Sequence, residues 1–275
     1  MTPGTRSINT VEPHPGQIEL TYDYVAMAAE LGDPVLPHTG EMTFEHPVVR
    51  VPGSLMDFVF TLTYRSGYVY DGPVGKHWEH NWDTRIQEAG NGASLTKYQG
   101  NRRDVYTESG TADVFLIAKG RSDLSVVRTI QNIGGNLVTI TAQDGTREVY
   151  ENLYGTWYFL KEVQARGSSL KIELLYDETD FHLTEVVDTR GKSFHLEYDG
   201  DFRLTEIEDW SSGSNGRNWL MGYDSTTKDL TAVETPLIGG VRRRTEFTYT
   251  GGTAVAWRRL MTSVKAPREV AVSGS

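Results

Sequence analysis

One dipeptide recurs at regular steps through the second half of the chain, and it constrains the fold more than any other feature. A tyrosine is followed by an acidic or polar residue five times, and successive tyrosines are 26, 22, 25 and 26 residues apart. The copies are Tyr150-Glu151, Tyr176-Asp177, Tyr198-Asp199, Tyr223-Asp224 and Tyr249-Thr250. Self-similarity at such a period indicates that each copy is one supersecondary unit of a repeat fold.

A second motif alternates with the tyrosines. It reads Leu-x-x-Val or Leu-x-x-Ile, and its last copy carries an extra residue. The copies begin at Leu160, Leu183, Leu204, Leu230 and, in the looser form, Leu260. Turn signals such as Arg190-Gly191 fall between the end of one motif and the start of the next.

Each unit therefore predicts a pair of strands. In the segment from Phe194 to Tyr198, Phe194, Leu196 and Tyr198 would share one face of a sheet, because side chains alternate along a strand. Asp199-Gly200-Asp201 would turn the chain, and Leu204 would begin the antiparallel return. One unit buries too little alone, so neighbours must stack. We expect an all-β fold with a curled antiparallel sheet of successive hairpins over residues 144–265.

The rest of the chain predicts more strands and two less ordered ends. Residues 33–143 contain short β-branched and aromatic runs separated by turn signals, which favours further hairpins. Residues 1–32 are expected to be a leader, in which Ile18–Leu31 could form a strand or a short helix. Pro34 would end that element, because it disfavours a helical residue before it. Residues 266–275 are expected to be a tail.

Composition excludes several classes of function. With 27 basic and 37 acidic residues the net charge is −10, which argues against duplex nucleic acid as the main partner. The chain has no cysteine, so disulfides and cysteine-based metal sites are excluded. It has no apolar run long enough for a transmembrane helix. Its first ten residues do not read as a secretory signal peptide.

The densest polar cluster is His77-Trp78-Glu79-His80-Asn81-Trp82-Asp83. On a strand, His77 would share a face with the acidic residues, whereas His80 would lie with the two tryptophans on the other face. Diverging histidines are poor ligands for a shared metal. No serine nucleophile motif, phosphate loop or dinucleotide motif is present. We therefore expect no catalytic residue, no metal and no cofactor.

Two other features have a structural and a functional interpretation. Trp157 and Trp219 could stack on sugars, although aromatic residues in repeats more often form cross-strand packing. The basic run Arg242-Arg243-Arg244 is more typical of a solvated turn or of a strand edge guarded against pairing.

The paired motifs resemble the YD repeat of bacterial Rhs proteins, toxin-complex subunits and teneurins. The preceding segment adds to the resemblance, through Gly32-Asp33-Pro34-Val35, Thr39-Gly40-Glu41, Val51-Pro52-Gly53, Leu62-Thr63-Tyr64-Arg65-Ser66 and the run from Gly72 to Asp83. The matching residues are Asp33, Pro34, Gly40, Arg65, Gly75, Trp78, His80 and Asn81. His77 is a departure, because the family pattern has glycine before the tryptophan.

The resemblance implies a shell wound from repeats, which in that family often encloses a toxic domain. Five units are too few for a closed shell, so the resemblance implies a fragment, a split shell or a short relative. The structural residues it implies are Tyr150, Tyr176, Asp177, Leu183, Gly191, Tyr198, Asp199, Leu204, Tyr223, Asp224, Leu230 and Tyr249.

The expected function is thus encapsulation or scaffolding without catalysis. The alternatives are a cell-surface module that binds carbohydrate or protein and, less favoured, a polysaccharide-active enzyme. We expect the partner to be protein, bound by strand addition at an open sheet edge, either as a second copy or as another shell segment. The resemblance implies a protein outside the cell or on its surface. It would be exported from the cytoplasm by a route other than a visible signal peptide.

Overall fold

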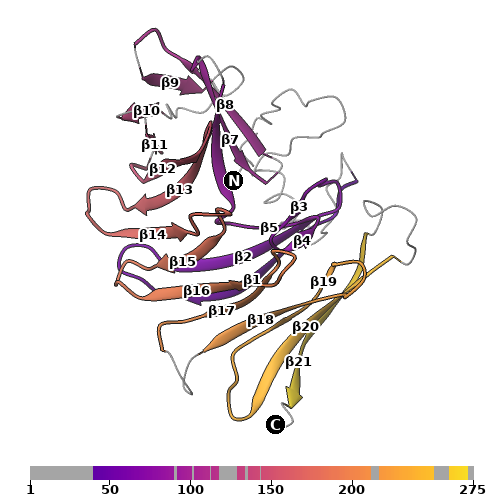
Figure 1. Ribbon diagram of the computed structural model, residues 1–275. Helices are drawn as coiled ribbons and strands as arrows, with labels where there is room; N and C mark the ends of the chain where they lie inside the picture. Colours follow the sequence, from indigo (N-terminus) through magenta and orange to yellow (C-terminus); the bar gives the residue numbers. More distant parts are fainter. Residues whose placement is uncertain are drawn as a thin grey trace, which may run out of the picture. The chain divides into compact units, whose positions relative to one another are not determined.

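The computed structural model describes residues 40–89, 92–100, 102–111, 113–117, 129–133, 136–142, 144–211, 217–250 and 260–271. Over these residues the protein is all-β and contains no helix (Figure 1). Accordingly, a helix long and apolar enough to span a membrane is absent from the described part. The expected leader at residues 1–32, Asp33 and Pro34 lie outside the described residues. The predicted fold class and the succession of antiparallel hairpins are confirmed.

The described residues divide into two compact units, and the first takes in Trp82–Lys171. Its strands are β6 (Thr84–Glu88), β7 (Ser94–Gln99), β8 (Arg102–Glu108), β9 (Val114–Ile117), β10 (Thr129–Ile133), β11 (Leu137–Thr141), β12 (Arg147–Tyr154) and β13 (Trp157–Gln164). Each strand pairs antiparallel with the next one along the chain. Strand β13 pairs in addition with β6, so every strand of this unit has at least two partners.

The second unit combines Phe44–Asn81 with Ile172–Ser275. Its larger sheet, here called the hairpin sheet, contains β14 (Lys171–Tyr176), β15 (Leu183–Val187), β16 (Ser193–Tyr198), β17 (Leu204–Glu208), β18 (Asn218–Tyr223), β19 (Leu230–Glu234), β20 (Val241–Tyr249) and β21 (Met261–Ala271). These strands pair antiparallel in chain order. Strand β21 runs on to Ala271, past the expected end of the repeats at residue 265.

The N-terminal part of this unit, residues 44–81, is here called the N-terminal segment. It forms a sheet in the order β1-β2-β5, from β1 (Thr43–Val51), β2 (Phe58–Arg65) and β5 (Trp78–His80). A two-residue hairpin, β3 (Asp71–Gly72) and β4 (Gly75–Lys76), lies between β2 and β5. In Figure 1 the indigo strands β1 and β2 run beside the orange strands β15 to β17, and Phe58 on β2 stacks on Phe194 of β16.

The hairpin sheet follows the alternation that the sequence predicts, with one systematic irregularity. On β16, Phe194 and Leu196 are buried, whereas His195 and Glu197 are exposed. The register then shifts between Glu197 and Tyr198, and β14, β18 and β20 shift at their repeat tyrosines in the same way. A bulge re-aims the side chain at which it occurs. Tyr198 is therefore half-buried rather than deep in the core with Phe194 and Leu196.

Candidate functional site

The repeat aspartates close the turns that follow their tyrosines. These Tyr-Asp turns span residues 177–182, 199–203 and 224–229. In each of them one oxygen of the first aspartate accepts hydrogen bonds from two backbone N–H groups further along the turn, at 2.7–3.2 Å. Asp177, Asp199 and Asp224 therefore act locally, because carboxylates that bond their own backbone initiate turns.

The repeat tyrosines join consecutive hairpins through their hydroxyl groups. Tyr198 donates to the carbonyl oxygen of Leu183 at 2.8 Å, and Tyr223 donates to that of Leu204 at 2.8 Å. Tyr249 donates to Leu230 at 2.6 Å. This tyrosine ladder explains why the two sequence motifs alternate, since the tyrosine of one copy bonds the leucine of the copy before it. Burial raises the pKa of Tyr223, so the hydroxyl keeps its proton.

The first repeat tyrosine belongs to the first unit and has a different environment. Tyr150 is fully buried, and its hydroxyl donates to Glu148 Oε2 at 3.0 Å. Glu148 also forms a 2.6 Å ion pair with Lys97, and Thr84 Oγ1 lies 3.3 Å from the Tyr150 hydroxyl. Burial raises the pKa of Tyr150. The hydroxyl of this tyrosine therefore belongs to a buried polar network and does not form a rung of the tyrosine ladder.

Two further aspartates order the turns at the opposite ends of the strands, and the sequence reasoning missed them. Asp188 accepts the N–H groups of Arg190 and Lys192 at 2.8 and 2.9 Å, and the guanidinium of Arg190 lies 3.0 Å from its second oxygen. Asp209 does the same with Ser211 and Arg217. The sequence does contain a signal for these aspartates. Each follows its motif leucine, Leu183 or Leu204, by five residues.

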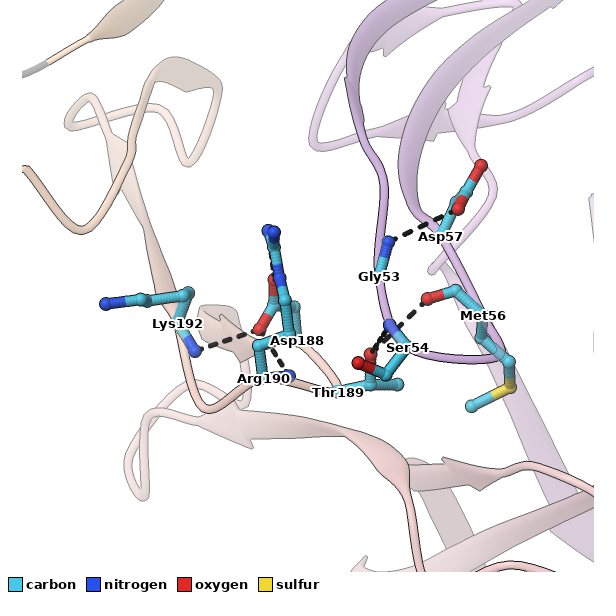
Figure 2. A network of polar contacts seen from close by, with 8 residues as sticks. All are labelled: Gly53, Ser54, Met56, Asp57, Asp188, Thr189, Arg190 and Lys192. Carbon is cyan, nitrogen blue, oxygen red and sulfur yellow. Dashed lines mark hydrogen bonds and ion pairs between the residues drawn. The ribbon is translucent and has the colours of Figure 1, made fainter.

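The turn that contains Thr189 binds the loop between β1 and β2, as Figure 2 shows. The backbone N–H of Ser54 donates to Thr189 Oγ1 at 2.8 Å, and that hydroxyl lies 3.5 Å from the carbonyl oxygen of Met56. Asp57 accepts the N–H of Gly53 at 3.3 Å within the loop. A Cβ atom on Gly53 would lie 1.9 Å from the Met56 oxygen and 2.7 Å from Thr189 Oγ1, so this close approach requires glycine.

The hairpin β3–β4 binds the Tyr-Asp turns. Arg203 forms an ion pair with Asp71 and donates to the carbonyl oxygen of Gly72, while its side chain is only 11% exposed. The next N–H, that of Leu204, donates to Pro73 at 2.7 Å. Lys76 Nζ reaches the carbonyl oxygen of Thr227 in the following turn at 3.3 Å. This short hairpin thus connects two consecutive Tyr-Asp turns.

Aromatic side chains complete the contact between the N-terminal segment and the hairpin sheet. Trp78 is fully buried, packs edge-on against Phe247 at 4.9 Å, and donates from Nε1 to the Tyr249 hydroxyl at 2.9 Å. Tyr64 accepts the N–H of Met261 at 2.8 Å. The tryptophan therefore extends the tyrosine ladder into the N-terminal segment.

Among the family-motif residues, Trp78 lies in this contact, and the residue before it, His77, departs from the expected pattern. His77 is 2% exposed, whereas alternation placed it with the polar face. Its φ of +65° breaks the alternation, and this backbone region favours the glycine of the family pattern. Trp78 and His80 share the buried face, as expected, and Asn81 caps the strand through the backbone of Thr61 and Val59 at 2.8 and 2.9 Å.

The remaining candidate residues lie at separate places. Arg65 is buried, and Gly40, Gly75 and Gly191 have positive φ angles. Trp219 is 8% exposed, so little of its ring faces solvent. Trp157 is half-buried beneath Arg85, whose Cζ lies 5.5 Å from the ring centroid. Across the described ranges, no cluster of histidine and acidic side chains has the arrangement of a metal site.

Comparison with known protein families gives a match for part of the chain. A family model described as a domain of unknown function (DUF6531) matches residues 32–105, which include all eight family-motif residues. No curated protein matches. Among solved structures, the N-terminal domain of effector protein SpvB from Salmonella typhimurium strain LT2 is similar, at 11% identity and a TM-score of 0.36. That match covers 83% of this chain and 100% of the SpvB chain.

Proposed function

We propose that this chain is a non-enzymatic structural segment of a YD-repeat shell of the Rhs type. It would encapsulate or scaffold a cargo, or assemble with other shell segments. The observation that carries the proposal is the N-terminal segment bound along the hairpin sheet. Its contacts reach the turn at Thr189, the turn at Arg203, the turn at Thr227 and the last two strands. Contacts spread along the hairpin sheet in this way hold its strands in one arrangement.

The buried aspartates that follow the leucine motifs support a structural role over a catalytic one. The carboxylates of Asp188 and Asp209 are fully buried, and each accepts two backbone N–H groups and an arginine. A general acid or base needs a proton-transfer path to a substrate, whereas these oxygens are already occupied. Sustained turnover of a sugar polymer by the purified protein would contradict the proposal.

Assembly would use the last strand of the hairpin sheet. Among the described strands, β21 pairs with β20 alone, whereas β15 to β20 each pair with two neighbours. An edge strand presents unpaired backbone groups to which another strand can add. Lys265 and Pro267 follow Val264 near the middle of the strand, and both residue types discourage edge pairing. We therefore propose that a partner strand adds along Met261–Val264. Export to the cell surface or beyond belongs to the same proposal.

Light scattering across the micromolar range tests the assembly step, together with hydrogen exchange of β21. We expect the mass to rise with concentration and the β21 amides to become protected as it rises. Val264→Lys should reduce association, because a charge on an edge strand discourages pairing. His195→Lys is the matched control, since β16 is paired on both edges. A monomer at every concentration, with β21 already protected, would refute the proposal.

A further inference from the structure

A compact group of basic side chains lies at the ends of the strands opposite the Tyr-Asp turns. At its centre the half-buried indole of Trp210 packs edge-on against the buried ring of Phe194, with centroids 5.5 Å apart. The indole centroid lies 5.1, 5.8 and 5.9 Å from Arg217 Cζ, Lys192 Nζ and Arg190 Cζ. The indole and these three cations are here called the basic cluster. It stands out in a chain whose net charge is −10.

Both arginines of the cluster are held in place from the protein side. Nε and Nη2 of Arg190 donate to Asp188 at 3.2 and 3.0 Å, and Nε of Arg217 donates to Asp209 at 2.5 Å. The two carboxylates are fully buried, whereas the arginine side chains are 39% and 48% exposed. Within the described residues, Nη1 of Arg190 and both Nη atoms of Arg217 make no hydrogen bond. These outer N–H groups are fixed donors that a ligand can use.

The lysine of the cluster is not explained by the turn in which it lies. Its backbone N–H donates to Asp188 at 2.9 Å, but any residue type with an N–H could make that bond. The ammonium of Lys192 has no ion pair or hydrogen bond to the described part of the chain, and in Figure 2 it extends away from the β1–β2 loop. The two buried carboxylates balance the two arginines, so the charge of Lys192 stays uncompensated beside two cations that repel it.

We infer that the basic cluster is a docking site for an acidic segment of a partner protein. Tryptophan and arginine are among the residue types that most often carry the binding energy of protein interfaces. A guanidinium group binds a carboxylate through two parallel N–H groups, and one that is already held in place loses little freedom on binding. A nucleic acid would carry its charge past the rest of an acidic surface, which the net charge of −10 disfavours.

Fluorescence anisotropy with two labelled peptides tests this inference on the whole chain. One peptide alternates glutamate and serine, and the other has glutamine in place of each glutamate. We expect the acidic peptide to bind and the neutral peptide not to bind. Added salt should weaken the binding, because it screens exposed charges.

Substitutions in the cluster show whether the peptide binds there. Lys192→Glu should weaken binding about tenfold, and it leaves the backbone bond to Asp188 in place. Arg217→Lys should weaken it about threefold, because the charge is kept and the planar donor pair is lost. The matched control is Lys161→Glu, the same change of charge at a 44% exposed lysine of the first unit, which should leave binding unchanged. Thermal melts check that each variant is folded.

Three results would overturn the inference. They are no binding of the acidic peptide, equal binding of the neutral peptide, and a Lys192→Glu protein that binds like the wild type. A single-stranded thymidine oligonucleotide is the third probe. If it binds more tightly than the acidic peptide and Lys192→Glu abolishes that binding, the cluster binds nucleic acid and the inference is wrong. None of these results affects the proposed assembly, which is measured at β21 without peptide.

Discussion

At the scale of single residues, the polar groups of the repeats connect backbone rather than perform chemistry. Tyrosine hydroxyls donate to carbonyl oxygens of the preceding hairpin, and aspartate oxygens accept N–H groups of their own turn. Both arrangements satisfy backbone groups that the bulges and turns remove from the sheet ladder. A buried group of this kind left without a partner would be costly. This explains why tyrosine and aspartate recur together in the three middle copies of the motif.

Removing one rung of the tyrosine ladder should be measurable. Tyr223→Phe deletes the hydroxyl that donates to Leu204 at 2.8 Å, so that carbonyl oxygen loses this hydrogen bond. We expect the free energy of unfolding to fall by about 1–2 kcal/mol in urea denaturation. The control is Tyr154→Phe, at a tyrosine that is 62% exposed, which should change stability by less than about 0.5 kcal/mol. Equal effects of the two substitutions would remove the ladder as a source of stability.

The half-buried His46 and the buried His77 predict a loss of stability in mild acid. Burial lowers the pKa of His46 and His77 below the ordinary value of 6.5. His46 packs on the rings of Phe44 and Phe247, while Asp71 and Asp229 raise, and Lys76 lowers, the pKa of His77 to a smaller extent. The unfolded chain therefore binds more protons than the folded chain as the pH falls through about 6.5.

Stability should accordingly be complete above that pH and decrease below it. Urea denaturation at about pH 7.5 and about pH 5.5 measures the difference, in a window where ordinary carboxylates stay ionised. His46→Phe should reduce the pH dependence, because the ring contacts remain and the titrating group is gone. His195→Gln, at an exposed histidine, should leave it unchanged. Identical pH dependence in the wild type and His46→Phe would show that His46 does not contribute.

At the scale of elements, the hairpins were predictable and the contacts of the N-terminal segment were not. Phased motifs fix strands such as β16 and β17, because period-two alternation and turn residues are local signals. The bond between Thr189 and Ser54 joins residues 135 positions apart, and that between Tyr64 and Met261 joins residues 197 apart. Such contacts leave no periodic trace in one sequence. The buried position of His77 was missed for a different reason, its positive φ.

The β1–β2 loop offers a direct test of this docking. Gly53→Ala should destabilise the protein by about 1–3 kcal/mol, because the new methyl group would overlap the Met56 carbonyl and Thr189. Gly200→Ala is the matched substitution, since nothing lies within 4 Å of its Cβ position and its φ is not positive. Thermal unfolding of both variants measures the effect. A Gly53→Ala protein as stable as Gly200→Ala would mean that the loop does not bind the Thr189 turn.

At the scale of the whole molecule, the two units of the described chain differ in which stretches of the sequence form their cores. In one unit, strands β6 to β13 come from a single stretch of chain, residues 84–164, and each pairs with the next. The other unit joins residues 44–81 to strands that begin more than ninety residues later. Its buried aromatic residues come from both parts, as the pair Phe58–Phe194, stacked at 4.1 Å, shows. Neither part of that unit has a complete core of its own, so they should unfold together.

Hydrogen exchange under increasing denaturant can detect this cooperative unit. Phe194 is fully buried between the two parts, and Phe194→Ala should cost about 3–5 kcal/mol. We expect the substitution to lower the protection of amides in β2 as much as in β16 to β18, because one opening reaction would expose all of them. Leu175→Ala, at a side chain that is 45% exposed, should leave both sets of amides protected. If β2 keeps its protection while β16 to β18 lose theirs, the N-terminal segment folds independently and cannot be what holds the hairpin sheet in place.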